Sequence, residues 1–576
     1  MRQIRFRLRT TITFILATLI IFILTSLYTV IWSTNELERE EEEHRDVPIP
    51  PGVIPFWSAV NHQNIYDLHA TPSNPVFIRS SNITPRRIEE LFQLIRNARA
   101  DETHSLDKEK LFPIDSAWNF EKLVEQQQQA NAQDEPNKNP ETHADTADSA
   151  NKAVTTTTTT TTTTVHPDIT TTVKSVSEHD KVQLRNYIHQ ALAKWKKEHQ
   201  NDKIVTLASL VHDELLRDEP SKLNTTWYAF MKTVNNLRVY DPRSPEFPRL
   251  LNHLQNAEII EASEMSQGTQ IKVIFDLPDG FEALFKPYRV PRNYQTLPDH
   301  FYFSDIERHH AEIAAFHLDK ILGFYRVPPL IGRLVHITRD IHERATEDLA
   351  KTFFVSPANN TCFRGHCSYY CDTSHAVCGK PGDRLEGSVQ ILLPRPPEVE
   401  WHKITHPYRR SYSAIRKAKW ENNENYCYDH VFLDDDYHNR LLLDMMDLSA
   451  FDFLIGNLDR HHMMRIGSFG ANTALVHLDN GRSFGRYDHD DLTILTPIRQ
   501  CCLFRYSTFA RLYRVYRQGL STLLSRSLEN SEQLKKILVD EHLRAVDRRL
   551  EILFEHLETC IKTYTVKGVM IDDGID

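Results

Sequence analysis

The hydrophobic pattern of residues 181–576 is rich in strand-type spacing before about residue 441 and mainly helical after it. Before that point, residues 270–275 and 281–286 read as two short strands, separated by Leu277-Pro278-Asp279-Gly280, which is typical of a hairpin turn. A helix is expected from about Asp305 to Leu322. Helical spacing then dominates residues 441–455, 508–527 and 532–563. A strand-rich half followed by a helical half predicts an α+β fold with segregated layers.

Charge and glycine content exclude several classes of nucleotide-binding protein. Lys and Arg total 68 against 78 Asp and Glu, so the formal net charge is −10, which argues against a nucleic-acid binder that relies on basic excess. No two of the 17 glycines lie two residues apart, and the sequence contains neither GxGxxG nor GxxxxGK[ST]. A Rossmann site, a Walker P-loop and an ordinary kinase glycine loop are therefore absent.

The N-terminal region predicts a membrane tether. Residues 11–32 carry no charge, follow four arginines and precede a run of glutamates, which predicts a type II signal anchor after a cytoplasmic tail at 1–10. A cleaved signal peptide is the alternative, although its apolar region is usually shorter. Residues 33–180 include the unbroken run Thr155–Thr164 and predict a low-complexity luminal stem, whose cleavage would release the domain at 181–576.

All eight cysteines lie between Cys362 and Cys560, which favours disulfides in an oxidising lumen. A zinc site is the alternative for the cluster Cys362, Cys367, Cys371 and Cys378, but its spacing lacks a CxxC pair. The adjacent Cys501 and Cys502 require two different partners, and Cys427 and Cys560 lie outside the cluster. Glycosylation sequons occur at Asn82, Asn224 and Asn359.

Two aspartates are the strongest candidates for chemistry. Asp459 lies in a polar loop after an apolar helix, and Asp479 ends the apolar segment 474–478, which is expected to be a buried strand. One carboxylate in a loop and a second at a strand end suit metal-assisted phosphoryl transfer, with one acting as base and the other holding a divalent ion. Two ordinary turn-capping residues are the alternative.

Lys286 ends the second strand, and Glu307 on the following helix is its expected partner. With 100° per residue, Glu307 shares the apolar stripe of that helix, whereas Glu312 falls on the opposite, solvent side. A Lys–Glu pair of this kind orients ATP phosphates in kinases. Alternatively, Ser304-Asp-Ile-Glu307 matches a capping box, in which Glu307 only satisfies the start of its helix.

From about Ser263 to Cys560 the sequence resembles the secretory-pathway kinases related to four-jointed, and most closely the Golgi casein kinases, which are extracellular Ser/Thr protein kinases. The motifs that carry this resemblance are Gly268-Thr-Gln-Ile-Lys272, Phe285-Lys286-Pro287, Phe301-Tyr-Phe-Ser-Asp-Ile-Glu-Arg308, Phe451-Asp-Phe-Leu-Ile-Gly-Asn-Leu-Asp459-Arg-His-His462 and His477-Leu-Asp479-Asn-Gly-Arg482.

The resemblance implies an atypical two-lobed protein-kinase fold, with a β-rich N-lobe containing one helix and a mostly helical C-lobe. It implies ATP as phosphate donor and manganese as cofactor, with magnesium as the alternative. Asp459 would be the catalytic base, Asp479 and Glu307 the metal ligands, and Asp479 would also contact the nucleotide. The remaining nucleotide-binding positions would be Gln270, Lys272 and Lys286 at the phosphates and Gln390, Ile391, Leu392 and Leu393 at the adenine.

Further features follow from the same resemblance. The implied disulfides are Cys362–Cys378, Cys367–Cys371, Cys427–Cys501 and Cys502–Cys560. Substrates would be acidic secreted proteins with Ser-x-Glu or Ser-x-phosphoserine, for which the basic block at 409–419 is a candidate reader. The location would be the Golgi membrane with a luminal catalytic domain, and the partners a second copy or a related pseudokinase.

One residue departs from the family pattern. The relatives read His-His-Tyr-Glu after the catalytic Asp, whereas this chain reads His461-His462-Met463-Met464. A thioether is a poor ligand for a hard cation. Either another carboxylate compensates, or ATP binding is weaker, or the chain is a pseudokinase that acts on an active partner. A xylose kinase of proteoglycan linkers is a further alternative.

Overall fold

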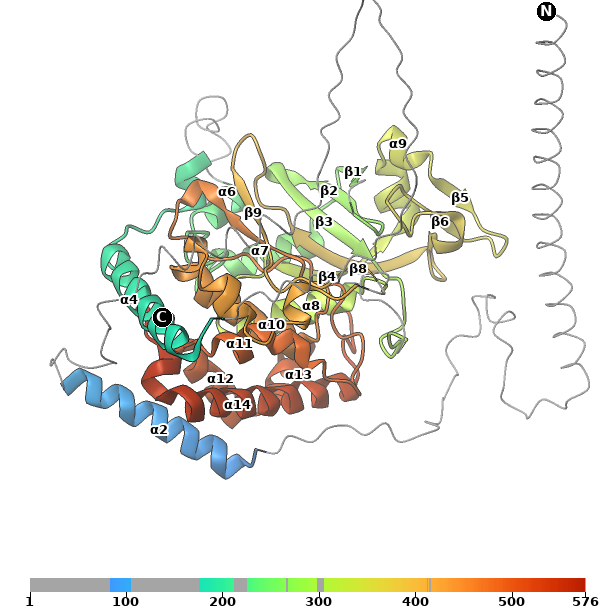
Figure 1. Cartoon of the computed structure of the whole chain (residues 1–576). Coiled ribbons are helices and arrows are strands. Elements are labelled where there is room, and N and C mark those ends of the chain that lie inside the picture. The colour runs from blue at the N-terminus through green and yellow to red at the C-terminus, as the bar shows by residue number, and fades with distance from the viewer. Residues whose placement is uncertain are drawn as a thin grey trace, which may run out of the picture. The chain divides into compact units, whose positions relative to one another are not determined.

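Five antiparallel strands form the sheet of the N-terminal lobe, in the order β1-β2-β3-β8-β4 (Figure 1). Their bounds are β1 Glu261–Glu264, β2 Val273–Leu277, β3 Phe281–Pro287, β4 Leu330–His336 and β8 Arg384–Ile391. The predicted hairpin between β2 and β3 is confirmed: Leu277 pairs with Phe281, and Asp279 turns the chain with φ of 68°. β2 begins three residues later than expected, so Gln270 lies in the loop before it.

The computed structural model describes residues 83–104, 176–211, 225–265, 268–297, 305–411, 413 and 416–574. All of them belong to one unit, Phe77–Asp576. The expected anchor at 11–32, most of the expected stem, and the sequons at Asn82 and Asn224 lie outside the described residues. Within the described ranges, no helix is both long enough and apolar enough to cross a bilayer.

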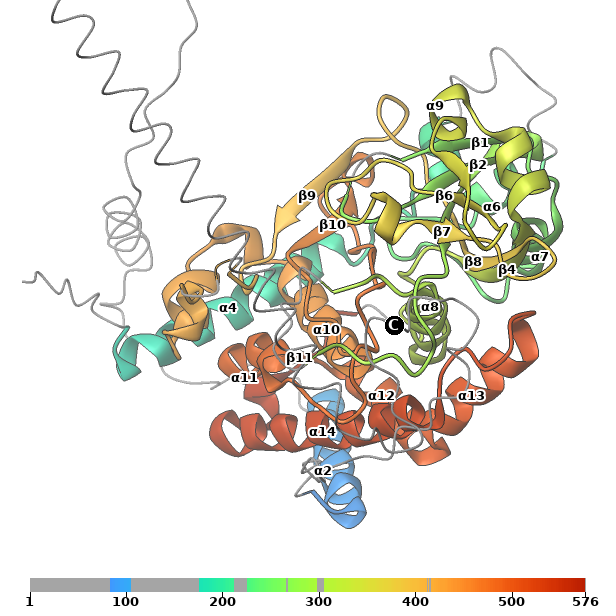
Figure 2. The same cartoon turned by 90° about the vertical axis from the view of Figure 1, so that its right-hand side faces the viewer.

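Helix α8 (His309–Leu322) lies between the sheet and the helical lobe (Figure 2). It begins four residues later than expected, because the backbone of Arg308 is extended, with φ of −108° and ψ of 117°, and its N–H donates to the carbonyl of Gly481 at 2.7 Å. Since α8 is covered by both lobes, twelve of its fourteen residues are buried. A single apolar stripe facing a single core is therefore the wrong description of this helix.

The C-terminal lobe consists mainly of helices, as the sequence pattern predicts. Its main helices are α10 Arg440–Ile455, α11 Thr496–Cys501, α12 Tyr506–Gln518, α13 Leu520–Ser531 and α14 Asp540–Val569. The single helix expected at 508–527 is two helices, broken at Gly519 with φ of 79°. The helix expected at 532–563 begins only at Asp540, as α14. Glu532 is buried before it and accepts a hydrogen bond from the backbone N–H of Gly332 at 2.6 Å.

The segment 474–478 is buried as expected but is not a strand. It forms one isolated bridge, Val476 to Met464. The N–H groups of Ala474 and His477 bond to the carbonyls of Asn236 and Arg326, and that of Leu475 bonds to the side chain of Asp444 on α10. The remaining short elements are α6 Thr226–Met231, α7 Glu246–Asn256, α9 Glu347–Ala350, β5 Phe353–Val355, β6 Thr361–Phe363, β7 Val377–Cys378, β9 Trp401–Thr405, β10 His462–Ile466, β11 Phe504–Arg505 and β12 Met570–Ile571.

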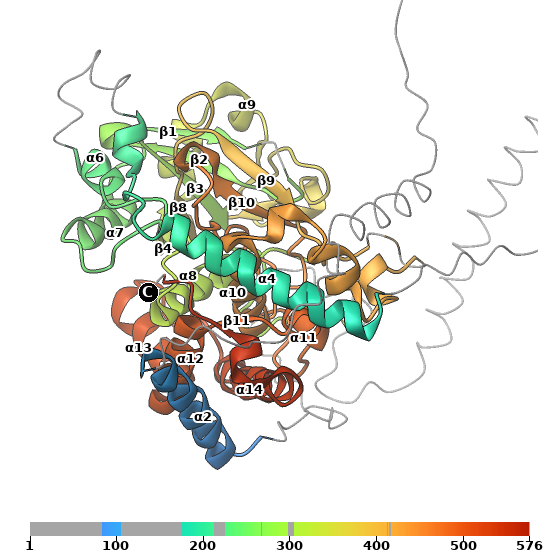
Figure 3. The same ribbon diagram turned by 60° about the vertical axis from the view of Figure 1, so that its left-hand side comes forward.

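Two helices outside the lobes brace the helical lobe. Helix α4 (Glu178–His199) crosses its side (Figure 3), where the guanidinium of Arg185 donates to the carbonyl of Cys501 at 2.7 Å. Helix α2 (Pro85–His104) packs on α12 and α14: the ring of Phe92 stacks on Tyr513 with centroids 3.8 Å apart. The folded body thus includes α2, which lies within the range expected to be stem. Amphipathic packing of α2, with Ile88 fully buried, explains this departure.

Candidate active site

Lys286 on β3 is buried among three carboxylates. Its Nζ hydrogen-bonds to Glu312 Oε1 and lies 3.2 Å from Glu307 Oε2 and 3.1 Å from Asp479 Oδ1. Burial by itself would lower the pKa of this lysine, but the three carboxylates outweigh it and hold the pKa well above its usual value. Lys286 is therefore a fixed positive charge at the centre of the site.

Asp479 is presented by a tightly held turn. Its backbone has φ of 59°, and the next residue, Asn480, donates its N–H to Glu312 Oε2 at 3.2 Å. A Cβ on Gly481 would lie 3.1 Å from the Cβ of Glu307, so a larger residue would push these segments apart. Lys286 holds the pKa of Asp479 well below its ordinary value, and the carboxylate is 45% exposed. An ionised, accessible carboxylate results.

Asp459 lies in the loop that follows α10. Its backbone N–H donates to Asn457 Oδ1 at 3.0 Å, and its Oδ2 accepts a hydrogen bond from Arg482. Burial raises the pKa of Asp459 to about 6; Arg482 lowers it, and the negative charge of Asp479 raises it. Near neutral pH the carboxylate is mostly ionised, yet it is basic enough to accept a proton.

Arg460 joins the loop of Asp459 to the turn of Asp479. Its guanidinium bonds to Asp452 at 2.9 Å, to Asn480 Oδ1 at 2.7 Å, and to the carbonyl of Leu478. Because Asp452 is on α10, Arg460 connects the loop of Asp459 and the turn of Asp479 to this helix. Asp459 and Asp479 consequently line one cavity together with Met464, Val476 and Leu478.

The loop before β2 faces the same carboxylates. Lys272 Nζ lies 3.7 Å from Glu307 Oε1, and Gln270 donates its side-chain N–H to the carbonyl of Asp305 at 3.1 Å. The Cys367–Cys371 disulfide closes a short loop that holds this segment through two backbone bonds, from Ser368 N to the Gly268 carbonyl at 2.9 Å and from Tyr370 N to the Thr269 carbonyl at 3.0 Å. The loop before β2, which has no glycine-rich sequence, is thus held in place by the loop that the Cys367–Cys371 disulfide closes.

The residues expected at the hinge lie at and just beyond the end of β8. Gln390 pairs with Leu284 on β3, and Leu284 lies two residues before Lys286. The side chains of Gln390 and Lys286 therefore point to the same face of the sheet. Gln390 Nε2 is buried without a hydrogen-bond partner among the described residues. The backbone N–H groups of Ile391 and Leu392 are already bonded, to Pro329 and Glu282 at 3.0 and 2.9 Å. Leu393 follows and is also buried.

The donor set fits a hard divalent cation with a nucleotide. Glu307 and Asp479 approach Lys286 from two segments, and carboxylate oxygens are the ligands that magnesium and manganese prefer. Among the described residues, no cluster of three or more His, Cys, Asp or Glu side chains forms a complete protein metal site. Where a cation binds together with its nucleotide, one or two protein carboxylates usually supply part of its ligands, and phosphate oxygens and water supply the rest.

A family profile described as "Fam20C: Golgi casein kinase, C-terminal, Fam20" matches residues 225–569 of the chain. The chain belongs to this family. The human extracellular serine/threonine protein kinase FAM20C is 44% identical over 354 residues, which are 61% of this chain and 60% of FAM20C. Human pseudokinase FAM20A is 37% identical over 412 residues, covering 68% of this chain and 75% of FAM20A. Glycosaminoglycan xylosylkinases of zebrafish and human also match.

A solved structure supports the same assignment. The Golgi casein kinase with Mn/ADP bound is 37% identical, with a TM-score of 0.60 over 70% of this chain and 96% of that one. The kinase-like, mixed α/β fold predicted from the sequence is thereby confirmed.

The predicted pairing of Lys286 with Glu307 is present in this Fam20 chain, at 3.2 Å, but the arguments about their helix and about Glu312 are not borne out. Since α8 begins at His309, Glu307 precedes the helix and cannot be the N3 residue of a capping box. Glu312, expected in solvent, is 2% exposed and hydrogen-bonds to Lys286. Both the stripe argument and the capping-box argument were wrong, because each assumed that the helix starts near Asp305. Arg482 is the last residue of a motif quoted for the resemblance but was given no role, and Glu312 was wrongly placed in solvent.

The four disulfides have the pairing that the resemblance implies. The bonds Cys362–Cys378, Cys367–Cys371, Cys427–Cys501 and Cys502–Cys560 are all present. The zinc alternative for the cysteine cluster is therefore wrong, because its thiols are consumed in disulfides. Asn359 is exposed in the turn between β5 and β6.

Met464 and part of the basic block border the catalytic loop. Met464 on β10 pairs with Lys403 on β9 and lines the cavity that Asp459 and Asp479 share. In the block, Arg409, Arg416, Lys417 and Lys419 are exposed, whereas Arg410 hydrogen-bonds to Thr493. Arg410 and Trp420 line a small cavity with Asn457 and Arg460, beside the loop of Asp459.

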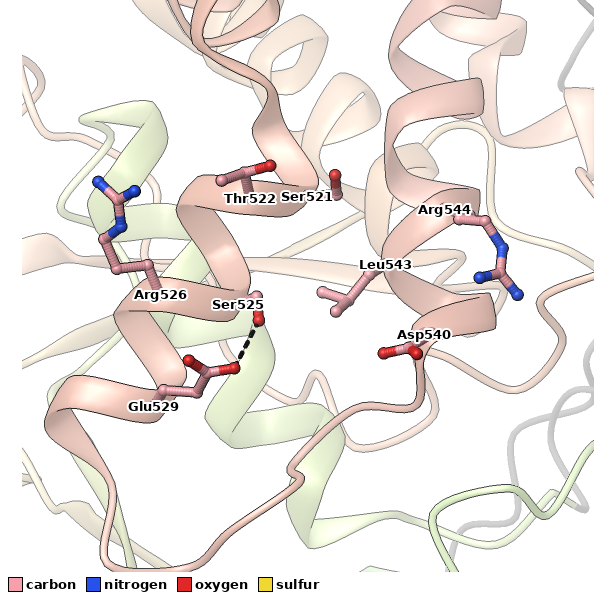
Figure 4. A pocket seen from close by; sticks show the side chains of 8 residues that line it. All are labelled: Ser521, Thr522, Ser525, Arg526, Glu529, Asp540, Leu543 and Arg544. Atoms are coloured by element: carbon pink, nitrogen blue, oxygen red, sulfur yellow. Dashed lines mark hydrogen bonds between the residues drawn. The ribbon is translucent and has the colours of Figure 1, made fainter.

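A separate groove of about 390 Å³ lies between α13 and α14 (Figure 4). All of its lining residues except Leu543 are polar or charged, and Ser525 donates a hydrogen bond to Glu529 at 2.9 Å along one wall. None of the candidate site residues lines it. Its residues are Ser521, Thr522, Ser525, Arg526, Glu529, Asp540, Leu543 and Arg544.

Proposed function

We propose that this chain is an ATP-dependent protein serine/threonine kinase that phosphorylates serines followed by an acidic or phosphorylated residue at the second position. The observation that carries the proposal is the cavity shared by Asp459 and Asp479, with Lys286 bonded to the second of them. The names of relatives such as the extracellular kinase FAM20C support the reaction class. The exposed basic residues beside the catalytic loop suit an acidic acceptor segment.

In this proposal each side chain has one role. Asp459 accepts the proton of the serine hydroxyl as the hydroxyl oxygen bonds to the γ-phosphorus of ATP, and the bond from that phosphorus to the β–γ bridging oxygen breaks, so that ADP leaves. Lys286, Lys272 and Gln270 face the phosphates, and the hinge Gln390, Ile391, Leu392 and Leu393 holds the adenine. Glu307 and Asp479 would hold manganese, or magnesium, whose charge offsets that of the phosphate oxygens.

Two other functions remain as alternatives with their own support. A sugar hydroxyl on a xylosylated acceptor could replace serine, because glycosaminoglycan xylosylkinases are relatives. A pseudokinase role is favoured by one observation: Met464 places a thioether in the cavity of Asp459 and Asp479. In that case the chain would act by binding a related active kinase.

One assay distinguishes the three functions. The full chain, purified in detergent, is incubated with manganese, γ-labelled ATP and either a Ser-x-Glu peptide or a xylosylated acceptor, beside the variant Asp459→Ala. Labelled peptide that is lost in the variant supports the protein kinase, and labelled sugar supports the xylose kinase. Absence of labelling, together with retained nucleotide binding and stimulation of a related kinase, supports the pseudokinase.

The same proposal includes a location and partners. A cytoplasmic tail at 1–10, a signal anchor at 11–32 and a stem at 33–180, interrupted by α2, would present the catalytic domain to the Golgi lumen, and cleavage of the stem would secrete it. Four disulfides and the exposed sequon at Asn359 suit that compartment. A second copy or a pseudokinase like FAM20A is the proposed partner. Protease protection in microsomes tests the topology.

A further inference from the structure

Arg482 connects the two sides of the active-site cleft. It follows the turn of Asp479, and its guanidinium donates one hydrogen bond to Asp459 Oδ2 and a second, 2.8 Å long, to the hydroxyl of Thr269. The side chain is only 9% exposed. One guanidinium therefore spans from the catalytic loop of the helical lobe to the phosphate-facing loop of the sheet.

The backbone around Arg482 fixes its direction. Ser483 donates its N–H to the carbonyl of Asn480 at 3.1 Å, and Phe484 donates to the carbonyl of Ile455, the last residue of α10, at 2.8 Å. Ser483 and Phe484 are fully buried. An arginine anchored in this way can hold a carboxylate at a set angle, which a flexible surface ion pair cannot do.

The two oxygens of Asp459 are not equivalent. Oδ2 is occupied by Arg482, whereas Oδ1 is buried and accepts no hydrogen bond from the described residues. His461 Nδ1 is 3.8 Å from Oδ1, too far for a hydrogen bond, and it instead contacts the Asp459 carbonyl at 2.8 Å. Oδ1 is thus a buried acceptor, so the bond from Arg482 to Oδ2 sets the orientation of the carboxylate.

Thr269 extends the connection to the disulfide loop. Its hydroxyl accepts from Arg482, while its carbonyl accepts from Tyr370 within the loop closed by Cys367–Cys371. The orientation of the Asp459 carboxylate is thus linked through Arg482 and Thr269 to the segment that carries Gln270 and Lys272.

From this geometry we infer that Arg482 is a positioning residue: its bond to Oδ2 holds the carboxylate of Asp459 in the orientation that accepts the proton of the acceptor hydroxyl, and its bond to Thr269 sets the distance between base and phosphates. The inference rests on the proposed kinase function and extends it to a residue to which the sequence analysis assigned no role. Arginine suits this role because its planar fork serves two acceptors at once, which a lysine ammonium does less well.

The test measures kcat and the KM for ATP of the full chain with manganese and the acceptor that the wild type labels. We expect Arg482→Gln to lower kcat about ten- to hundredfold, with KM for ATP changed less than about threefold, because the base is misaligned while the nucleotide contacts remain. Arg482→Lys should restore part of kcat. Thr269→Val, which keeps the Asp459 contact, should lower kcat by about three- to tenfold.

Arg486→Gln is the matched control, since Arg486 lies four residues further on and pairs locally with Asp488 at 3.0 Å; its kcat should equal that of the wild type. If Arg482→Gln and Thr269→Val both retain kcat within about twofold, the inference is wrong. A rise in KM for ATP with unchanged kcat would assign Arg482 to nucleotide binding and also overturn it. A wild type inactive on every acceptor would overturn the proposed function, and the inference with it.

Discussion

Replacing Asp459 with asparagine should stabilise this protein at neutral pH while abolishing phosphotransfer. Burial raises the pKa of Asp459 to about 6 in the folded chain, against about 3.9 for an unfolded aspartate. The difference of about two pH units corresponds to about 3 kcal/mol of folding free energy, at about 1.36 kcal/mol per unit. Asparagine resembles the neutral carboxyl, so the variant avoids this cost.

The sign of the effect follows from proton binding. Below about pH 4 the carboxyl is protonated in both states and costs nothing. As the pH rises toward 6, the unfolded chain ionises first, so the folded wild type loses stability, and above about pH 6 the full cost applies. The advantage of the variant should therefore be about 3 kcal/mol at pH 7.5 and about half of that at pH 5.

Thermal unfolding without nucleotide or divalent cation measures this advantage. For a folded body of roughly 400 residues, about 3 kcal/mol corresponds to a Tm increase of about 3–4 °C. The matched control is Asp436→Asn, an exposed aspartate, which should change stability by less than about 0.5 kcal/mol. A variant that is no more stable than the wild type at pH 7.5, or whose advantage is undiminished at pH 5, would refute the burial argument.

Three further predictions concern other parts of the chain. Met464→Glu should raise the affinity for ATP measured calorimetrically in the presence of manganese, because a carboxylate replaces a thioether near the cation; unchanged affinity would mean that another group already compensates. Glu312→Gln should lower kcat at least about tenfold in steady-state assays, because Lys286 loses a charged partner; wild-type kcat would show that Glu307 alone suffices. Ile88→Ala in α2 should cost about 2–4 kcal/mol in denaturant unfolding, whereas Leu94→Ala, 52% exposed on the same helix, should cost far less; equal costs would show that α2 does not pack stably.

Local sequence signals predicted the parts of the fold that depend on local chemistry. The turn at Asp279 and the helix α10 follow from residue types and spacing within about fifteen positions, and both are present. The sequence also marked Asp459 and Asp479 as a pair, and both line one cavity, although the buried segment before Asp479 is not the strand that was expected.

Contacts between distant segments were not predictable in this way. The start of α8 is set by the bond from Arg308 to Gly481, which are 173 positions apart in the printed numbering, so no pattern near residue 305 could reveal it. Helix α2 shows the same limit, since Arg87 bonds to Glu558, 471 residues away. The composition of residues 33–180 predicts a stem, and the surface that buries α2 lies at the other end of the chain.

The charges in the cleft explain why the residue at position 464 affects the binding of a divalent cation. Four carboxylates, on Asp459, Asp479, Glu307 and Glu312, surround the site, and three cations, on Lys272, Lys286 and Arg482, interact with them. Each carboxylate thus already has a cationic partner, and any divalent ion must compete with Lys286 for Glu307 and Asp479. A fifth carboxylate at position 464 would add a negative charge to the cavity of Asp459 and Asp479 and favour the cation, even with Lys403 opposite it on β9. With methionine there, the binding of a divalent cation depends more strongly on the nucleotide that accompanies it, so manganese affinity measured without ATP is the quantity in which Met464→Glu should differ most from the wild type.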